Sequence, residues 1–351
     1  MSKRQLMKGN EALCQATLDA GCSCFFGYPI TPQNQVPERL SYLMPKAGRV
    51  FLQAESEVAA INMIYGAAST GVRAMTSSSS PGISLMQEGI SYMTGADLPA
   101  VIINVMRGGP GLGNIAPSQS DYFQATRGGG HGDYRLLVLA PSSVQEMYDL
   151  TRDAFELADK YRNPVMVLAD AILGQMMEAV TITREPQPVP ELKPWGAHGT
   201  KKGSRTVINS LYINPPDLEA VNKRLQAKYD QMRDEDLRWK ESDIDGADIV
   251  FIAYGSSARI CTTAINLLAE KGIKAGLFRP ITLFPFPYER LSEISKTAKK
   301  LLTVEMSLGQ MIEDVRLATQ DRCPLSFYGR TGGIIPTPEE VAAAALKELG
   351  K

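Results

Sequence analysis

Cysteine and histidine are scarce in this chain of 351 residues, and neither forms a metal-binding pattern. The five cysteines include no CxxC pair, and Cys22 and Cys24 lie too close together for an ordinary disulfide. We expect reduced, structural thiols, and no iron–sulfur ligation by this chain alone because its cysteines are not clustered. The only histidines are His131 and His198, which argues against a hydrolase that relies on histidine.

The chain also lacks an excess of charge of either sign and has no long apolar segments. Lys and Arg number 37, and Asp and Glu number 38, so a general attraction to nucleic acid or anionic membrane is not expected. No stretch approaches the ~20 apolar residues of a membrane span, and the N-terminal MSKRQLMKGNEAL lacks the apolar run of a signal peptide. Apolar residues make up 44% of the chain, which indicates packed cores. Reduced thiols, together with the lack of a signal-peptide pattern, lead us to expect a cytoplasmic protein.

Two nucleotide-binding motifs are absent or weak. The phosphate-binding sequence GxxxxGK[ST] does not occur. Residues 107–113, RGGPGLG, are rich in glycine and follow an apolar run, but Pro110 interrupts them and no helical pattern follows. As a dinucleotide fingerprint this loop is weak.

Short apolar runs alternate with helical patterns through the first half of the chain. The predicted strands are 23–27, 49–53, 73–76, 100–105, 136–140 and 164–170. The predicted helices are 8–20, 36–43, 57–69, 83–94 and 144–161, the last with the capping-box pair Ser143 and Glu146. Such alternation is typical of a mostly parallel, doubly wound sheet covered on both faces.

The amino-acid composition changes beyond residue 184. Residues 185–195 are rich in proline, and residues 216–242 are highly charged with one narrow apolar stripe at helical spacing, formed by Leu218, Val221, Leu225 and Tyr229. A second α/β pattern follows, with strands predicted at 249–254, 275–278 and 301–304, helices at 258–271, 288–297 and 311–319, and a last helix capped by Thr337 and Glu340. We expect one domain over 1–184, a linker with a charged helical arm over 185–245, and a second domain over 246–351.

Side chains that suit a ligand follow several predicted strands of the first domain. They are Thr31, Glu57, the serines at 77–80 and Arg107. In doubly wound sheets, ligands bind at the edge where the carboxyl ends of the strands meet. Thr31 stands out because Pro29 and Pro32 bracket the pair Ile30–Thr31 and stiffen the backbone on both sides.

Glu57 opens a predicted helix of small residues, EVAAINMIYGAAS. The pattern resembles the activating glutamate of thiamine-diphosphate enzymes, which hydrogen-bonds the aminopyrimidine ring and promotes removal of the C2 proton. Burial favours the neutral carboxyl that this role requires, and alanines allow close packing of a flat ring. The plainer interpretation is a first-turn glutamate that only complements the helix dipole.

Several segments together resemble one family. They are YPITP (28–32), AESEVAAINMIYGAAS (54–69), SSSSPGISLMQEG (77–89), ILGQ (172–175), FRPITLFPFP (278–287) and VEMSLGQMIEDV (304–315). The family is the α-type chain of the 2-oxoacid:ferredoxin oxidoreductases, and the resemblance covers both α/β units but is weakest in the linker. It implies a pyrimidine-binding thiamine-diphosphate domain followed by a domain similar to the transketolase C-terminal domain.

The resemblance also implies roles for matching residues. Glu57 would activate the cofactor, with Pro29 and Ile30 beside it. Thr31 would hydrogen-bond the 2-oxoacid, and Arg107 would pair with its carboxylate, for which a planar guanidinium is suited. Related chains often carry TSGPG where this chain has SSPG at 79–82, which is a departure from the pattern.

The diphosphate–magnesium motif of this family, GDG followed later by Asn, is absent, since His131-Gly132-Asp133-Tyr134 breaks it. The resemblance therefore implies a thiamine diphosphate shared with a β-type partner chain that holds Mg²⁺, and no metal ligands here. [4Fe–4S] clusters would reside on γ-type and ferredoxin-like chains. CoA, a 2-oxoacid and ferredoxin would be the reactants.

The loop after Arg107 bears on the choice of 2-oxoacid. A buried second carboxylate, as in 2-oxoglutarate, needs a cation or hydroxyls, and related 2-oxoglutarate chains tend to carry RGGPSTG. This chain has apolar Leu112 and Ile115, which resembles the version acting on 3-methyl-2-oxobutanoate (ketoisovalerate). Three alternatives stay open: a 2-oxoglutarate oxidoreductase chain, a CoA- or nucleotide-binding ligase chain, and a non-catalytic scaffold.

Overall fold

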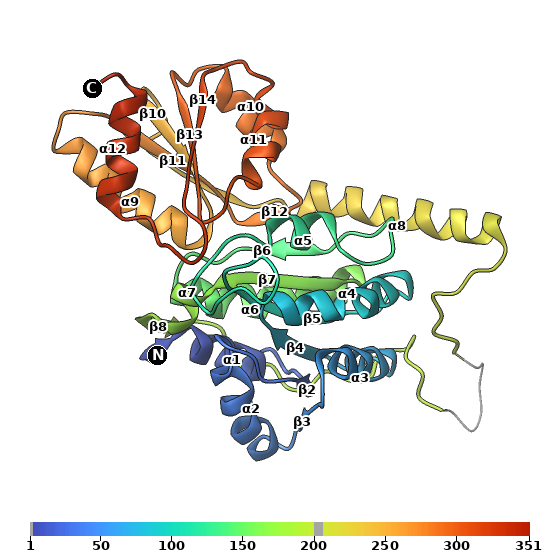
Figure 1. Cartoon of the computed structure of the whole chain (residues 1–351). Helices are drawn as coiled ribbons and strands as arrows, with labels where there is room; N and C mark the ends of the chain where they lie inside the picture. Colours follow the sequence, from blue (N-terminus) through green and yellow to red (C-terminus); the bar gives the residue numbers. More distant parts are fainter. Residues whose placement is uncertain (1–2, 200–205) are drawn as a thin grey trace.

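A seven-stranded sheet organises the first unit of the computed structural model, which describes residues 3–199 and 206–351 (Figure 1). Its order is β12-β6-β7-β5-β4-β2-β3. The parallel strands are β2 (Cys24–Gly27), β3 (Val50–Gln53), β4 (Ala74–Ser78), β5 (Ala100–Met106), β6 (Leu137–Leu139) and β7 (Pro164–Asp170). The edge strand β12 (Thr282–Phe284) comes from the second half of the chain and runs antiparallel to β6.

Helices cover both faces of this sheet because its central strands are apolar on both sides. In β5, Val101, Ile103 and Val105 pack toward α1 (Gly9–Asp19), α2 (Gln35–Lys46) and α6 (Val144–Tyr161). Ile102 and Met106 face the opposite way, toward α3 (Glu57–Ser69) and α4 (Ser80–Gly95). The alternation follows from the two-residue period of a strand.

The second unit contains a five-stranded sheet of order β14-β13-β10-β11-β9. Its strands are β9 (Trp239–Ser242), β10 (Ile249–Ile252), β11 (Ala275–Pro280), β13 (Leu301–Glu305) and β14 (Leu325–Gly329), with only β9 antiparallel to its neighbour. Helices α9 (Gly255–Ala269) and α12 (Pro338–Glu348) share one core with this sheet. Helices α10 (Tyr288–Ser295) and α11 (Met311–Thr319) pack on its other face.

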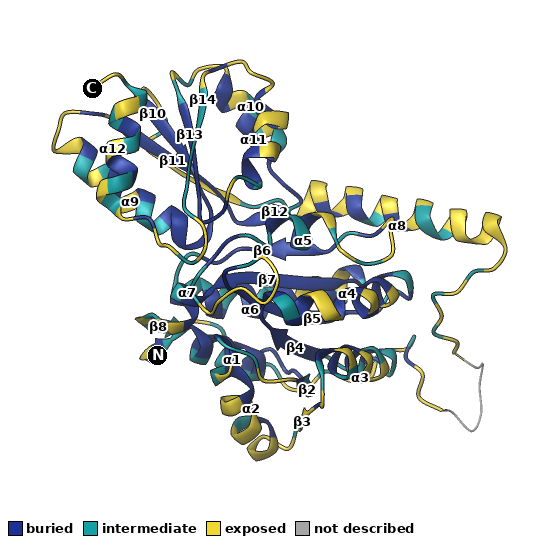
Figure 2. Cartoon of the chain, in the orientation of Figure 1, coloured by how far each residue is buried: buried dark blue, intermediate teal, exposed yellow. Residues whose placement is uncertain are grey.

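A long helix projects from the body between the two units (Figure 1). This helix, α8 (Pro215–Glu235), is the predicted charged arm, and Figure 2 shows most of its surface exposed. Of its predicted apolar stripe, Leu225 and Tyr229 are buried and Leu218 is exposed. The short elements β1 (Lys3–Lys8) and β8 (Met177–Ile182) pair antiparallel, and α5 (Tyr122–Arg127) and α7 (Ala171–Gln175) complete the secondary structure.

The predicted fold class is confirmed, and several predicted elements match residue for residue, namely β7, α3, α6 and α11. The capping box at Thr337 and Glu340 is also present. At α6 the box is only half formed: Ser143 Oγ accepts the Glu146 N–H, but the Glu146 carboxylate accepts the Ser142 N–H and binds Arg279 rather than the Ser143 N–H. The sequence did not predict β1, β8, β9, β12, β14, α5 or α7. The domain boundaries at 184 and 245 stay a prediction.

Candidate active site

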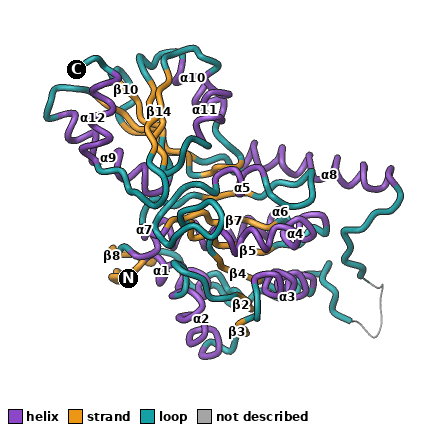
Figure 3. Tube along the Cα trace, in the orientation of Figure 1, coloured by secondary structure: helices purple, strands orange, loops and turns teal. Residues whose placement is uncertain are grey.

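The carboxyl ends of three neighbouring strands bring the predicted site residues to one edge of the first sheet. Strands β2, β4 and β5 are adjacent and parallel, and they lead into Thr31, the serines at 79–80 and Arg107. Loops gather between the two sheets (Figure 3), and the loop after β5 contacts the second unit through Asn114 and Gln119. Parallel pairing therefore assembles a site from segments far apart in sequence.

Thr31 and Arg107 are in direct contact. The buried Arg107 guanidinium donates from Nη1 to the Thr31 carbonyl at 2.9 Å and from Nη2 to the Leu112 carbonyl at 3.2 Å. Its Nε has no partner among the described residues. The Thr31 hydroxyl accepts a hydrogen bond from Asn34 Nδ2 at 3.1 Å, and its own proton remains available to donate.

The glycine-rich loop 108–116 wraps around this guanidinium. Arg107 and Pro117 form an isolated antiparallel β-bridge, and the Gly108 N–H donates to the Ala116 carbonyl at 2.9 Å. The loop is therefore closed at its base like a hairpin. Gly113 has a φ of 59°, and a Cβ there would lie 1.7 Å from the Gly108 carbonyl oxygen. The glycines serve this tight turn. From the second unit, the Gly332 carbonyl accepts a hydrogen bond from Asn114 Nδ2 at 2.9 Å.

Glu57 is a buried carboxylate at the first turn of α3, with only 6% of its surface exposed. No Lys, Arg or His lies within ion-pair distance of it in the described part of the chain. A Cβ at Gly82 would lie 2.6 Å from Glu57 Oε1 and 2.0 Å from Ser78 Oγ, so only glycine lets α4 begin this close. The buried hydroxyls of Ser78 and Ser79 have no hydrogen-bond partner among the described residues.

Pro29 and Ile30 lie in the turn between β2 and Thr31. Pro29 is exposed and Ile30 is half-buried. The turn is closed by Gln33, whose N–H donates to the Ile30 carbonyl at 3.0 Å. Gln33 is fully buried, and its Oε1 accepts a hydrogen bond from Ser77 Oγ at 2.7 Å, which ties the turn to the end of β4.

Two polar residues at this edge were not predicted, Asn104 and Asp121. Asp121 Oδ2 accepts hydrogen bonds from Ser80 Oγ at 2.6 Å and from Asn104 Nδ2 at 2.9 Å. Burial raises the pKa of Asp121, although these two hydrogen bonds oppose the rise. Asn104 had a sequence signal, since it is a polar residue inside the apolar run AVIINVM of β5. Asp121 had none.

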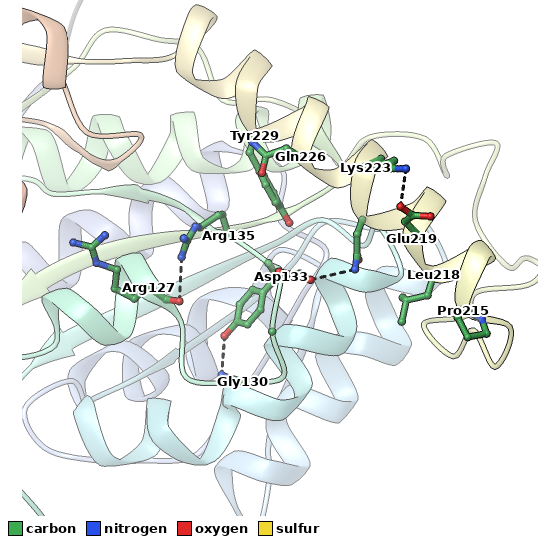
Figure 4. A pocket seen from close by; sticks show the side chains of 13 residues that line it. Arg127, Gly130, Asp133, Arg135, Pro215, Leu218, Glu219, Lys223, Gln226 and Tyr229 are labelled. Atoms are coloured by element: carbon green, nitrogen blue, oxygen red, sulfur yellow. Dashed lines mark hydrogen bonds and ion pairs between the residues drawn. The ribbon is translucent and has the colours of Figure 1, made fainter.

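A cavity of about 360 Å³ adjoins this edge and is formed by both units. Its lining includes Ser80, Asp121 and the loop 109–111 from the first unit, and Leu308, Gln310 and Thr331 from the second. A larger cavity, of about 640 Å³, lies elsewhere, between α8 and the loop 127–135 (Figure 4). There Tyr229 and Gln226 of α8 face Arg135 and Asp133, and none of the predicted site residues takes part.

The described residues contain neither a metal-binding cluster nor a helix that could span a membrane. Over residues 3–199 and 206–351, His, Cys, Asp and Glu nowhere gather in a group of three or more that suits a metal ion. Of the helices described, none is both long enough and apolar enough to cross a membrane.

Comparisons with known proteins place the two α/β units of this chain in the thiamine-diphosphate enzyme class. A solved structure described as "Split gene transketolase, inactive beta4 tetramer" has the same fold, with a TM-score of 0.59 over 98% of both chains at 15% identity. The profile "Pyruvate flavodoxin/ferredoxin oxidoreductase, thiamine diP-bdg" matches residues 15–236, and "Pyruvate:ferredoxin oxidoreductase core domain II" matches residues 247–341. The chain belongs to the thiamine-diphosphate-dependent 2-oxoacid:ferredoxin oxidoreductase family.

Individual relatives agree with this assignment. The chain is 51% identical to the ketoisovalerate oxidoreductase subunit VorB of Methanothermobacter thermautotrophicus, over 94% of this chain and 93% of VorB. It is 41% identical to the 2-oxoglutarate synthase subunit KorA of Archaeoglobus fulgidus, over 93% and 94% of the two chains. Both relatives are subunits, so this chain is a subunit of a multi-chain oxidoreductase.

A solved structure extends the similarity to the whole fold. It is the 2-oxoglutarate:ferredoxin oxidoreductase from Magnetococcus marinus with 2-oxoglutarate, coenzyme A and succinyl-CoA bound. The TM-score is 0.88 at 27% identity, over 99% of this chain. This chain spans 65% of the length of that one.

Proposed function

We propose that this chain is the α-type subunit of an oxidoreductase that converts a branched-chain 2-oxoacid and CoA into acyl-CoA and CO₂ and reduces ferredoxin. The observation that carries the proposal is the buried, unpaired Glu57 at the sheet edge where Thr31 and Arg107 meet. A mostly buried polar side chain without an ion-pair partner among the described residues, held beside the hydroxyls of Ser78 and Ser79, points to a functional role. The non-catalytic scaffold is disfavoured for the same reason.

The residues at this edge fit the pyrimidine half of thiamine diphosphate. Glu57 is buried, and the hydroxyls of Ser78 and Ser79 lack partners among the described residues, so polar groups of a ligand would satisfy them. When bound, this cofactor supplies a carbon nucleophile and an electron sink. Pro29 and Ile30 would line the turn beside it.

Each chain residue then has a defined task. Glu57 holds and moves the proton that it shares with the aminopyrimidine ring. Arg107 binds the 2-oxoacid carboxylate through N–H groups not used on Thr31 and Leu112, since a guanidinium has five. The Thr31 hydroxyl donates a hydrogen bond to the 2-oxoacid.

The cofactor is shared with a β-type partner that carries the diphosphate and Mg²⁺ site, since the matching motif is absent here. The surface of α3 and α4 supports a partner, because their only charged residues are Glu57 and Glu88. Exposed Val58, Leu85 and Tyr92 lie on these helices, and a nearly uncharged apolar surface is typical of an interface core.

Electron transfer requires further chains. The five cysteines are buried and unpaired, and burial raises the pKa of Cys14, Cys22 and Cys261 well above its usual value, so these are poor cluster ligands. We assign the [4Fe–4S] clusters to γ-type and ferredoxin-like chains. Free thiols suit a reducing compartment, which supports a place in the cytoplasm.

The branched-chain substrate is supported by the higher identity to VorB, at 51%, than to KorA, at 41%. Leu112 and Ile115 remain 80% and 61% exposed, so they would reach the substrate only when a partner covers the loop. The second candidate is 2-oxoglutarate, which is bound in the Magnetococcus marinus enzyme of similar fold. A ligase is disfavoured because both family models that match the chain describe oxidoreductases.

The test compares kcat/KM of the purified complex for 3-methyl-2-oxobutanoate, pyruvate and 2-oxoglutarate. We expect the first to be preferred by at least about 100-fold over 2-oxoglutarate, because an unpaired distal carboxylate is strongly rejected. A preference for 2-oxoglutarate would contradict the substrate assignment. Arg107→Lys should raise KM for the 2-oxoacid, since an ammonium cannot replace a bidentate fork, and an unchanged KM would remove Arg107 from the site.

A further inference from the structure

Asp121 has an unusual set of contacts for a loop residue. Both of its hydrogen bonds end on the same oxygen, Oδ2, with Ser80 Oγ at 2.6 Å and Asn104 Nδ2 at 2.9 Å. The other oxygen has no hydrogen bond from the described residues, although Asp121 lines the 360 Å³ cavity between the units. The carboxylate thus joins the start of α4 to the interior of β5.

Ser80 carries this connection to Arg107. Its hydroxyl donates to Asp121 and accepts a hydrogen bond from the Arg107 main-chain N–H at 3.0 Å. The Ser80 N–H donates to Asn104 Oδ1 at 3.1 Å, so Ser80 is held from two sides. Asp121 therefore fixes the Ser80 rotamer in which the hydroxyl oxygen accepts the Arg107 main-chain N–H. Arg107 directly follows the end of β5, so this contact holds the backbone from which its side chain extends.

The second unit holds the segment that carries Asp121. Gln119 is fully buried, and its Oε1 accepts hydrogen bonds from Ser257 Oγ at 2.6 Å and from the Met306 N–H at 3.0 Å. The Ser120 carbonyl accepts a hydrogen bond from Gln310 Nε2 at 2.6 Å. Contacts thus run without interruption from the second unit through 119–121 to Ser80 and Arg107.

We propose that Asp121 is a positioning residue that sets the direction of Arg107 and thereby the affinity for the 2-oxoacid carboxylate. The proposal rests on the role of Arg107 in the proposed function. It gives the second α/β unit a part in substrate binding, although the predicted site residues all lie in the first unit.

The test uses the assembled complex with Asp121→Ala and Asp121→Asn. Alanine removes both hydrogen bonds and should raise KM for the preferred 2-oxoacid about 10-fold, with kcat changed less than about threefold. Asparagine should restore KM to near the wild-type value, because one amide oxygen can accept both hydrogen bonds. Ser80→Ala removes the same hydrogen-bond connection between Asp121 and Arg107 and should raise KM by a similar factor. This second variant decides the test if the complex does not assemble with Asp121→Ala.

Asp236→Ala is the matched control. Asp236 is also buried, and its Oδ2 also accepts two hydrogen bonds, from Lys160 Nζ at 2.6 Å and Tyr161 Oη at 2.5 Å, but it lies at the end of α8. The Asp236→Ala substitution should lower the Tm of the complex without changing KM for the 2-oxoacid.

Three results would overturn the proposal. The first is an equal change of KM in Asp121→Ala and Asp236→Ala. The second is an unchanged KM in both Asp121→Ala and Ser80→Ala while Arg107→Lys raises it, which leaves the proposed function intact. The third is a loss of kcat in Asp121→Asn, which would make Asp121 an acid–base group. An unaltered KM in Arg107→Lys would instead count against the proposed function itself.

Discussion

The chemistry assigned to this chain depends on a few side chains whose surroundings differ sharply from water. Glu57 is buried beside Gly82 and has no cation near it among the described residues, whereas Glu55, two positions earlier, is exposed. The two glutamates therefore offer a test of which carboxyl acts on the cofactor.

Glu57→Gln should leave the fold intact and reduce kcat by about 10²–10⁴-fold, the range for a positioned acid–base group. The amide keeps the shape of the carboxyl but cannot relay a proton. Steady-state kinetics of the complex measures the effect, and Glu55→Gln is the matched control, expected near wild type. The reverse result would show that the wrong glutamate has been chosen.

Gly113 gives a second test at the scale of one residue. Gly113→Ala adds a methyl group that meets the Gly108 carbonyl, in addition to the cost of about 1–2 kcal/mol for a left-handed residue. The loop around Arg107 should open, with a rise of at least about 10-fold in KM for the 2-oxoacid.

Gly111→Ala separates the two costs of the Gly113 substitution. Gly111 also has a positive φ, of 67°, but a Cβ there meets nothing within 4 Å. This control carries the backbone cost alone and should change KM less. Equal effects of the two substitutions would mean that the clash does not matter.

At the scale of elements, the outer surface of α3 and α4 differs from that of α8. Helix α8 is charged along its length, as a solvated helix is, whereas α3 and α4 expose apolar residues such as Leu85 with Glu88 as their only exposed charge. We attribute this difference to a partner chain that covers α3 and α4.

Leu85→Lys should leave the chain folded but weaken its association with the β-type chain by at least about 10-fold, because a charge would be buried without a partner. Co-purification of the chains and their sedimentation measure the effect. Leu317→Lys, a similar change at an exposed position of α11, is the control and should leave assembly unchanged. Intact assembly of the Leu85 variant would place the partner elsewhere.

At the scale of the whole molecule, a mostly buried ion pair between Arg279 and Glu146 is among those that join the two units. Arg279 of β11 donates to both oxygens of Glu146 in α6, at 2.7 and 2.9 Å. Lys240 Nζ lies 2.9 Å from Glu146 Oε1. Burial opposes ionisation of Glu146, but the charge and hydrogen bonds of Arg279, with hydrogen bonds from Lys240 and Ser142, lower its pKa to about 2.

This lowered pKa makes stability depend on pH. An ordinary glutamate titrates near 4.5, so the pair stabilises the fold fully above that pH and loses its effect as the pH falls toward about 2. Glu146→Gln should lower the free energy of unfolding at pH 7 by on the order of 2–4 kcal/mol, and the difference from wild type should shrink at pH ~3. Urea unfolding at several pH values measures it.

Glu219→Gln is the control for this ion pair. Glu219 and Lys223 form an exposed pair on α8, worth less than about 1 kcal/mol. The control should show little change at any pH. A constant difference between wild type and Glu146→Gln from pH 7 to 3 would contradict the assignment.

The sequence by itself determined the features that depend on neighbours along the chain. Helix α3 begins at Glu57 and α6 at Val144 as predicted, because apolar periodicity and an N-terminal cap are local properties. Thr31 and Arg107 were predicted at one edge because parallel strands place their carboxyl ends together. Family membership followed from the same segments.

Only the tertiary structure decided which distant groups meet. Strand β12 has three residues and exists through pairing with β6, more than a hundred residues earlier. The Glu146 carboxylate accepts the Ser142 N–H and a two-pronged hydrogen bond from the distant Arg279, in place of the Ser143 N–H that a capping box requires. Asp121 and its connection to Arg107 through Ser80 had no local signature, because the free energy of a hydrogen bond depends on burial and partner geometry, which arise only when the chain folds.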